Sequence, residues 1–331
     1  MKEKRSRKPH RNGWWIALAV VAAVGVACAV VWTHSTVLQR AAVRFVCSLG
    51  TGKQQELAFS SVDTLLEDVS YESRFENGCL DLYARQSDTV QPLIVYAHGG
   101  YYIGGDKSSM TDYCRLLASR GYVVANINYM LAPEAKYPTQ ILQVNEAVSF
   151  LLKHAADYGI DPLRVFIGGD SAGGHLSSQM GLYYTDPDFQ REIGDEPALS
   201  AEQLRGVILH CGYYNTDTVR ATGFPMIADS IWMLTGVKDY EGTTVSEQMN
   251  TVKQISPDYP AVFIDCGDQD PFITQAHEMI DALHANGVEV VSYLPVTSQM
   301  PLMHEFQMQL SWPEAQEAME LLAGFLGERS K

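Results

Sequence analysis

The sequence predicts an α/β protein with a mainly parallel central sheet flanked by helices. Strand-like and helix-like segments alternate from residue 69 onward, and a glycine-rich turn at residues 169–173 joins one such strand to one such helix. The chain has 331 residues, of which 46% are hydrophobic and 19% charged, so it can form a large core. Strands separated by helices imply parallel pairing, because a parallel crossover needs about a dozen residues or more.

The expected elements follow one another along the chain. We expect strands at residues 69–73, 79–85, 93–97, 122–129, 164–167, 207–211, 261–266 and 288–294. We expect helices at residues 36–49, 110–119, 138–158, 172–184, 273–285 and 313–326. The long irregular insertion at residues 213–255 is expected to fold over the sheet edge as a small cap or lid, and a plain surface excursion is the alternative. The catalytic domain is therefore placed at 69–331, after a connector or cap helix at 33–68.

The N-terminal segment predicts a membrane anchor. Residues 1–13 contain six Lys or Arg and one Glu, and the following residues, 14–32, contain no charge and are bracketed by Trp14 and Trp32. Nineteen helical residues span about 28 Å, close to the ~30 Å hydrocarbon core of a bilayer. The basic tail predicts a cytoplasmic N-terminus, which places a single-pass protein in the cell membrane with its catalytic domain outside the cytoplasm. A cleaved signal peptide or a lipoprotein signal at Cys28 fits less well, because the apolar run is too long and Gly25 interrupts the lipobox pattern.

Charge and cysteine usage exclude several classes of function. The net charge is −15 despite the basic tail, so an acidic body would repel nucleic acid, and we expect no nucleic-acid partner. The six cysteines are scattered without a C-x-x-C pair or a Cys/His cluster, so we expect no metal site and no cofactor. An extracytoplasmic body would permit a disulfide, but the pattern assigns none.

Ser171 is the candidate nucleophile. It occupies the centre of Gly169-Asp170-Ser171-Ala172-Gly173, directly between an expected strand and an expected helix. This context matches the sharp turn that exposes a nucleophilic serine, and glycines flank it because side chains there would clash. Without that context the motif would more often be an ordinary tight turn.

A second glycine motif predicts the site that binds an oxyanion. His98-Gly99-Gly100 follows the expected strand at 93–97, where a loop from an earlier strand supplies backbone donors. We expect the N–H groups of Gly99 and Gly100 to form the oxyanion hole with that of Ala172. A glycine turn without a role is the alternative.

The general base is expected after the acid in the chain, which leaves three histidines. His277 and His284 fall in an expected helix, whereas His304 lies in a loop beyond the last strand, so we choose His304. The H-E-x-x-H zinc motif fails here, because Met308 stands where the second histidine would be.

The acid is expected on the loop after the strand at 261–266. Asp270 is chosen there, Asp268 is the reserve, and Asp265 lies within the strand itself. The alternative is that one of these aspartates only caps the helix at 273–285.

These motifs together resemble the hormone-sensitive-lipase-like branch of the α/β-hydrolases, which includes bacterial acetyl esterases and carboxylesterases. The resemblance spans residues 93–310 and is carried by His98-Gly99-Gly100-Tyr101, Asn128-Tyr129-Met130-Leu131-Ala132-Pro133-Glu134, Gly169-Asp170-Ser171-Ala172-Gly173-Gly174, Asp270-Pro271-Phe272 and His304-Glu305-Phe306. It implies an α/β-hydrolase fold and the same triad, Ser171, Asp270 and His304, with oxyanion donors at Gly99, Gly100 and Ala172. Two positions depart from the family pattern, since Tyr101 stands for the usual third glycine and Glu305 for the glycine after the base.

The resemblance implies a serine hydrolase that cleaves short-chain carboxylic esters, such as acetyl esters, through an acyl-enzyme. The partner would be a small ester molecule, with Tyr101 and Tyr102 bordering its pocket. An amidase, peptidase or acyltransferase would use the same triad. A non-catalytic binding module on a hydrolase scaffold is the remaining alternative, although such a module would be expected to lose a triad member.

Overall fold

The computed structural model describes residue 25 and residues 35–50, 62–296 and 300–331. The chain divides into two compact units, Met1–Ala42 and Val43–Lys331, and the boundary falls within helix α2 (Thr36–Gly50). The second unit holds all of the elements described below. The segment expected to cross a membrane, 14–32, lies outside the described residues except for Gly25. Among the helices that are described, none combines the length and the apolar character needed to cross a bilayer.

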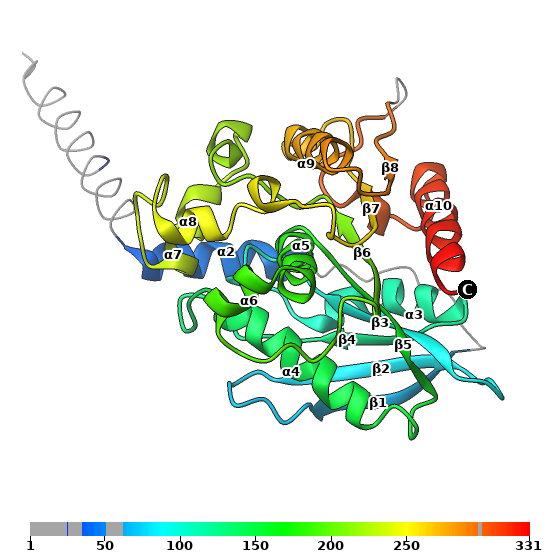
Figure 1. Cartoon of the computed structure of the whole chain (residues 1–331). Coiled ribbons are helices and arrows are strands. Elements are labelled where there is room, and N and C mark those ends of the chain that lie inside the picture. Colours follow the sequence, from blue (N-terminus) through cyan, green and yellow to red (C-terminus); the bar gives the residue numbers. More distant parts are fainter. Residues whose placement is uncertain (1–24, 26–34, 51–61, 297–299) are drawn as a thin grey trace, which may run out of the picture. The chain divides into compact units, whose positions relative to one another are not determined.

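The described residues form an eight-stranded sheet in the order β1-β2-β4-β3-β5-β6-β7-β8. Its strands are β1 (Val62–Ser70), β2 (Cys79–Arg85), β3 (Gln91–Ala97), β4 (Val123–Ile127), β5 (Ile160–Asp170), β6 (Leu204–His210), β7 (Val262–Asp265) and β8 (Val290–Tyr293). The pairs β1/β2 and β2/β4 are antiparallel and all the others are parallel. In Figure 1 the sheet runs from β1 at the bottom to β7 and β8 at the top. The mainly parallel sheet expected from the alternating pattern is therefore present.

Helices connect the strands and cover both faces of the sheet. The α-helices of the second unit are α3 (Thr111–Ser119), α4 (Thr139–Lys153), α5 (Ala172–Thr185), α6 (Pro187–Ile193), α7 (Ile227–Thr235), α8 (Thr244–Gln248), α9 (Ile273–Ala285) and α10 (Pro313–Arg329). Short 3₁₀ turns lie at η1 (Lys107–Met110), η2 (Val219–Thr222), η3 (Val252–Gln254) and η4 (Phe306–Met308).

The side chains of the sheet alternate between two apolar layers. Ile94 and Phe166 pack with α3 and α10 on one face, whereas Val95 and Ile167 pack with α4, α5 and α9 on the other. Neighbouring residues of a strand point to opposite faces, so a strand buried on both faces reads as an unbroken apolar run. This is why β3 and β5 are evident in the sequence.

The edge strand β1 differs from expectation. A strand was expected at 69–73 within a domain starting at 69, but β1 covers Val62–Ser70 and therefore occupies part of the expected connector. Most of its side chains are exposed or only partly buried, because it is the edge strand and pairs with β2 alone. Such a strand lacks the apolar alternation by which strands are identified in a sequence.

Two helical regions were also missing from the expected elements. Helix α6 was not expected, although Asp186 accepts hydrogen bonds from the N–H groups of Asp188 and Phe189 and Gly194 ends the helix in a left-handed conformation. An Asp followed by Pro is a known signal for the start of a helix, and a glycine for its end, so both signals were present in the sequence. The insertion at 213–255, expected to be irregular, contains α7 and α8.

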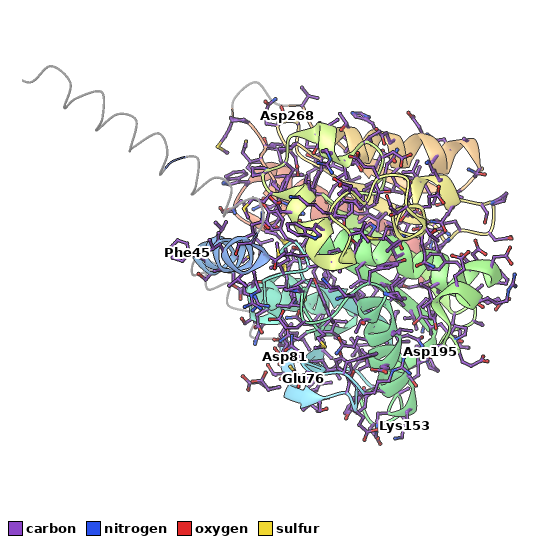
Figure 2. The ribbon with its side chains drawn as sticks, turned by 90° about the vertical axis from the view of Figure 1, so that its left-hand side faces the viewer. Phe45, Glu76, Asp81, Lys153, Asp195 and Asp268 are labelled. Carbon is purple, nitrogen blue, oxygen red and sulfur yellow. The ribbon has the colours of Figure 1, made fainter. Side chains whose placement is uncertain are left out.

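Polar side chains hold the loop that follows β3. Lys107, at its far end, is buried and donates to Asp81 of β2, which is labelled in Figure 2, over 2.6 Å. The backbone N–H of Lys107 donates to Asn128, and Asn126 donates back to the carbonyl of Lys107. The loop at 98–106 is thus fixed at both ends, by β3 and by this buried network.

Candidate active site

Ser171 lies at a sharp turn between β5 and α5. Its backbone has φ 51° and ψ −113°, a conformation that residues with side chains rarely adopt. The turn is held because the N–H of Ser171 donates to the carbonyl of His210, the last residue of β6, over 2.8 Å. The strained turn places the hydroxyl at the carboxyl end of the parallel strands, as the motif predicted.

The glycines beside Ser171 are required by backbone contacts. A Cβ atom at Gly173 would lie 2.0 Å from the carbonyl oxygen of Ala97, and one at Gly169 would lie 2.4 Å from the same oxygen. Strand β3 ends at Ala97, so the turn and the end of β3 pack backbone against backbone. Only glycine permits so close an approach.

The structure brings the three expected triad residues together. Nε2 of His304 lies 3.0 Å from Oγ of Ser171, and Nδ1 of His304 lies 2.7 Å from Oδ2 of Asp270. A carboxylate only accepts hydrogen bonds, so Nδ1 carries the hydrogen and Nε2 of the neutral ring accepts from the serine hydroxyl. This arrangement has the geometry of an activated serine nucleophile.

The electrostatic surroundings of His304 favour its protonated form. Burial disfavours the charged ring, but the hydrogen bond and charge of Asp270, together with the charge of Glu305, outweigh it and raise the pKa of His304 above 6.5. The histidine is thereby suited to accept the serine proton.

Asp270 contacts both His304 and the backbone just before α9, and because α9 has no side-chain cap the capping alternative does not apply to it. Its Oδ2 accepts from His304, while its Oδ1 accepts from the N–H of Phe272 at the start of α9 over 2.8 Å. Asp268, the reserve candidate, is labelled in Figure 2 and instead accepts from the N–H of Leu302. It ties the loop after β7 to the loop that carries His304.

The third aspartate of this region belongs to a separate buried chain of hydrogen bonds. Asp265 accepts from Nδ1 of His210 at 2.9 Å, and Nε2 of His210 accepts from the hydroxyl of Tyr113 at 2.8 Å. All three side chains are buried. Because the carbonyl of His210 also accepts from the N–H of Ser171, these hydrogen bonds support the turn that carries Ser171.

The oxyanion loop requires one correction. The N–H of Gly99, expected to face an oxyanion, donates to Oδ2 of Asp170 over 2.9 Å and is therefore already engaged. A Cβ atom at Gly99 would lie 3.1 Å from Cβ of Ser171, so the loop does pass directly beside the nucleophile. The N–H groups of Gly100 and Ala172 remain as the expected donors. Asp170 stood inside the serine motif, but a link to Gly99 across 71 residues has no local sequence signal.

Three consecutive residues of this loop adopt left-handed conformations. The φ angles are 115° at Gly100, 61° at Tyr101 and 63° at Tyr102. Glycine is the residue that tolerates such angles, and the motif that this loop resembles has a third glycine at the position of Tyr101. In this protein a tyrosine occupies the position of Tyr101 despite its unfavourable φ angle.

The two tyrosines of the loop have different surroundings. Tyr101 is partly exposed, and its ring packs against that of Phe224 with 5.4 Å between the ring centroids. Its side chain therefore borders the site, as expected. Tyr102 was also expected to border the substrate pocket, but its side chain is buried and its hydroxyl donates to Nδ1 of His175 over 2.7 Å. Tyr102 therefore holds the oxyanion loop through this buried hydrogen bond and does not line a pocket.

The insertion at 213–255 contributes to the site. The ring of Phe224 stacks on Phe272 and packs edgewise against His304, with 4.2 Å and 4.8 Å between the ring centroids. The hydroxyl of Ser230, on α7, donates to the carbonyl of Tyr101. The insertion thus covers the base and the oxyanion loop. Phe224 was not among the expected site residues, because its contacts with the site arise only from the folding of the insertion over the sheet edge.

His175 joins the same insertion to the oxyanion loop. Its Nδ1 accepts from Tyr102, and its Nε2 donates to the carbonyl of Met249 over 2.9 Å. The bond that Nδ1 accepts from Tyr102 requires the neutral ring, and burial lowers the pKa of His175 to about 4. The ring also stacks on Tyr213 at 4.3 Å. His175 follows the serine motif by four residues, yet nothing in the sequence indicated this function.

One group of side chains near the triad has the composition of a metal site. The ligand atoms of Cys211, Asp270 and His304 lie within 4.8 Å of one another. Both nitrogens of His304 already take part in hydrogen bonds to Asp270 and Ser171. A metal ion here would have to replace the contacts that activate the serine.

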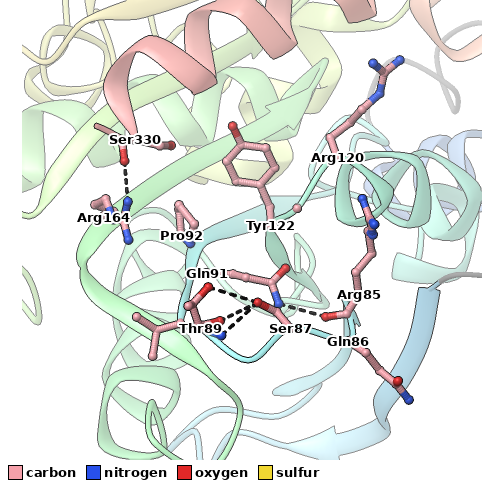
Figure 3. A pocket seen from close by; sticks show the side chains of 12 residues that line it. Arg85, Gln86, Ser87, Thr89, Gln91, Pro92, Arg120, Tyr122, Arg164 and Ser330 are labelled. Atoms are coloured by element: carbon pink, nitrogen blue, oxygen red, sulfur yellow. Dashed lines mark hydrogen bonds between the residues drawn. The ribbon is translucent and has the colours of Figure 1, made fainter.

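A cavity of about 420 Å³ lies at the other end of the sheet. It is lined in part by Arg85, Arg120 and Arg164, and by Gln91, the first residue of β3 (Figure 3). The parallel strands begin at this end, whereas Ser171 follows the carboxyl end of β5. This cavity is therefore separate from the triad.

Comparison with known proteins agrees with the fold and the motifs. The model of the BD-FAE family matches residues 80–283. Two relatives come from Mycobacterium tuberculosis (strain ATCC 25618 / H37Rv). "Esterase LipC" is 24% identical over 65% of this chain and 54% of its own length, and "Probable carboxylic ester hydrolase LipM" is 28% identical over 70% and 54%. The chain spans about half the length of these curated relatives.

The solved structures of esterase B from Lactobacillus rhamnosis (HN001) have the same fold. One superimposes with a TM-score of 0.74 at 24% identity, covering 94% of this chain and 95% of that chain. Another, described as inhibited with a C4-C4 SN3 tributyrin phosphonate, gives 0.72 at 25% identity and covers 94% and 96%.

The fold and the sharp turn at Ser171, between β5 and α5, define an α/β-hydrolase. The resemblance to esterases of this class is confirmed. Within that class, the chain belongs to the BD-FAE family.

Proposed function

We propose that the protein is a carboxylic ester hydrolase in which Ser171, His304 and Asp270 form the catalytic triad. The observation that carries the proposal is the continuous hydrogen-bond chain from Oγ of Ser171 through His304 to Asp270, with contacts of 3.0 and 2.7 Å. Esterase names among the relatives support the same class of reaction.

The reaction proceeds in two halves. Ser171 Oγ attacks the ester carbonyl as Nε2 of His304 takes its proton, and the protonated histidine then gives that proton to the departing alcohol. Water attacks the acyl-enzyme in the second half, with His304 again as base, and the acid leaves as Ser171 recovers its proton. Asp270 holds the ring in the required tautomer and stabilises its charged form.

The N–H groups of Gly100 and Ala172 are the proposed oxyanion donors. Ala172 is the first residue of α5, and the first N–H groups of a helix have no acceptor within the helix. The positive end of the helix dipole adds to their effect. In our proposal Gly99 acts indirectly, because its bond to Asp170 fixes the loop against the serine.

The acyl group is proposed to be short, with acetyl esters as the first candidates. Tyr101 stands where the family motif has a glycine, and its ring packs against Phe224 beside the base. Two aromatic rings at this position restrict the volume available to an acyl chain. The tributyrin phosphonate that inhibits esterase B is also derived from a short-chain ester.

We further propose that residues 14–32 anchor the protein in the cell membrane, with the basic N-terminal tail in the cytoplasm and the hydrolase outside. The uncharged run, its flanking tryptophans and the six basic residues before it support this orientation. A C-terminal reporter that is active only outside the cytoplasm should therefore function. A reporter active only inside the cytoplasm would overturn the orientation.

The catalytic proposal is tested on the full chain in detergent with p-nitrophenyl esters of two to twelve acyl carbons. We expect turnover to be highest for the shortest esters and a fluorophosphonate probe to label the wild type. Ser171→Ala should lose the label and about 10⁵-fold or more in kcat. Ser177→Ala, a buried serine in the same helix α5, is the matched control and should keep both. Labelling of the Ser171→Ala variant would refute the assignment, and the absence of turnover on every ester in the wild type would refute the activity.

A further inference from the structure

Glu305 is the residue of the active site whose presence the triad does not explain. It follows the base directly, at a position where the family motif has glycine. Its backbone is left-handed, with φ 61°, so the local conformation favours glycine and disfavours a residue with a side chain. The chain retains a charged side chain at a position whose backbone disfavours it.

The carboxylate of Glu305 faces the reacting atoms. Its Oε1 lies 3.8 Å from Nε2 of His304, the nitrogen that itself contacts Oγ of Ser171. The side chain is 37% exposed, so it is open to an incoming molecule. Its other titratable neighbours are Asp170, Tyr101, Cys47 and Cys211, none of which carries a positive charge.

Asp170 and Glu305 place two carboxyl groups next to each other. Asp170 is buried, one of its oxygens accepts from Gly99, and the carboxyl group of Glu305 lies next to its side chain. Burial, and then the neighbouring charge of Glu305, raise the pKa of Asp170 well above its usual range. Because Asp170 is the more deeply buried of the two, its raised pKa favours its neutral form, and Glu305 is the more exposed member of the pair.

Among the described residues the ion-pair partner of Glu305 is His304, and no Lys or Arg lies within ion-pair distance of it. A partly exposed carboxylate beside the nucleophile can form an ion pair with a positive group on a bound molecule.

Building on the proposed esterase function, we propose that Glu305 is a specificity residue that selects esters carrying a positively charged ammonium group close to the scissile bond. The ammonium binds beside the carboxylate of Glu305, and this attraction holds the ester carbonyl at Ser171. A neutral ester of the same shape gains nothing from this contact, so the selection appears as a ratio between two matched substrates.

The test compares matched substrate pairs that differ only in charge. Acetylcholine and 3,3-dimethylbutyl acetate place the charge on the alcohol side, and betaine ethyl ester and ethyl 3,3-dimethylbutanoate place it on the acyl side. The kcat/KM ratio of charged to neutral ester is measured for the wild type, for Glu305→Gln, and for Glu320→Gln, which removes an equal charge from the exposed surface of α10. Dividing one enzyme's ratio by another's cancels the intrinsic reactivities of the esters.

We expect Glu305→Gln to lower the charged-to-neutral ratio by about tenfold in at least one pair, and Glu320→Gln to leave both ratios unchanged. The pair that responds identifies the side of the ester that faces Glu305. Equal losses on charged and neutral esters would show that Glu305 acts only through His304, and this would overturn the proposal. An unchanged ratio in both pairs would overturn it as well. Absence of turnover on all four esters by the wild type would instead refute the esterase function on which it rests.

Discussion

Replacing Gly173 by alanine tests the backbone packing that shapes the nucleophile turn. The added Cβ would lie 2.0 Å from the carbonyl oxygen of Ala97, 2.8 Å from its carbonyl carbon and 2.9 Å from the carbonyl oxygen of His98. All three are backbone atoms, so no side chain can rotate away. Ordinary contact begins near 3.4 Å, and one of the two backbones must therefore move by about 1.4 Å.

That displacement affects both stability and catalysis. Overpacking a rigid interior typically costs about 1–3 kcal/mol, and we expect at least about 3 kcal/mol because the contact is backbone to backbone. The end of β3 leads directly into the oxyanion loop, and misplacement of catalytic groups by about 1 Å can lower turnover about 100-fold. We expect that loss in kcat/KM even at temperatures where the variant remains folded.

The assay combines urea unfolding with ester turnover, and Gly324→Ala is the control. Gly324 is an exposed glycine in α10 with no atom within 4 Å of an added Cβ. Alanine there should stabilise the protein by about 0.5–1 kcal/mol and leave kcat/KM unchanged. Wild-type stability and activity in Gly173→Ala would refute the reasoning, because they would mean that the turn can open without cost.

Three further predictions concern the residues around the triad. His175 has a depressed pKa of about 4 in the folded state against 6.5 for a free histidine, so the stability that it contributes is present above pH 6.5 and is lost as the pH falls towards 4, by about 3 kcal/mol in total. Urea unfolding between pH 7 and 4 should show a shallower loss for His175→Asn than for wild type, and equal slopes would contradict the assignment. Asp270→Asn should lower kcat about 10³- to 10⁴-fold and move the acidic limb of the kcat/KM profile to lower pH, since the raised pKa of His304 depends on that carboxylate. Phe224→Ala should lower kcat/KM about tenfold and cost about 3 kcal/mol in urea, and a loss of stability at unchanged kcat/KM would show that the ring only fills space.

The sequence by itself determined the class of fold and indicated Ser171 and His304 as the candidate nucleophile and base. Buried parallel strands such as β3 and β5 appear as unbroken apolar runs, and their alternation with helices indicated the sheet. The turn around Ser171 is local, since its glycines and the flanking strand and helix are adjacent in the chain. His304 was identified by its position in a loop rather than a helix. The edge strand β1 was misplaced, because its largely exposed face lacks an apolar pattern.

The tertiary structure decided which groups meet around these local motifs. The sequence favoured Asp270 and kept Asp268 in reserve, and the folded loops show that Asp270 reaches His304 while Asp268 binds the backbone at Leu302. The N–H of Gly99 proved to be engaged by Asp170, which is remote in the chain. These contacts join segments 34 to 71 residues apart. A one-dimensional pattern records spacing along a helix, strand or turn, whereas contacts over such separations arise only when the sheet brings the ends of its strands to a common edge.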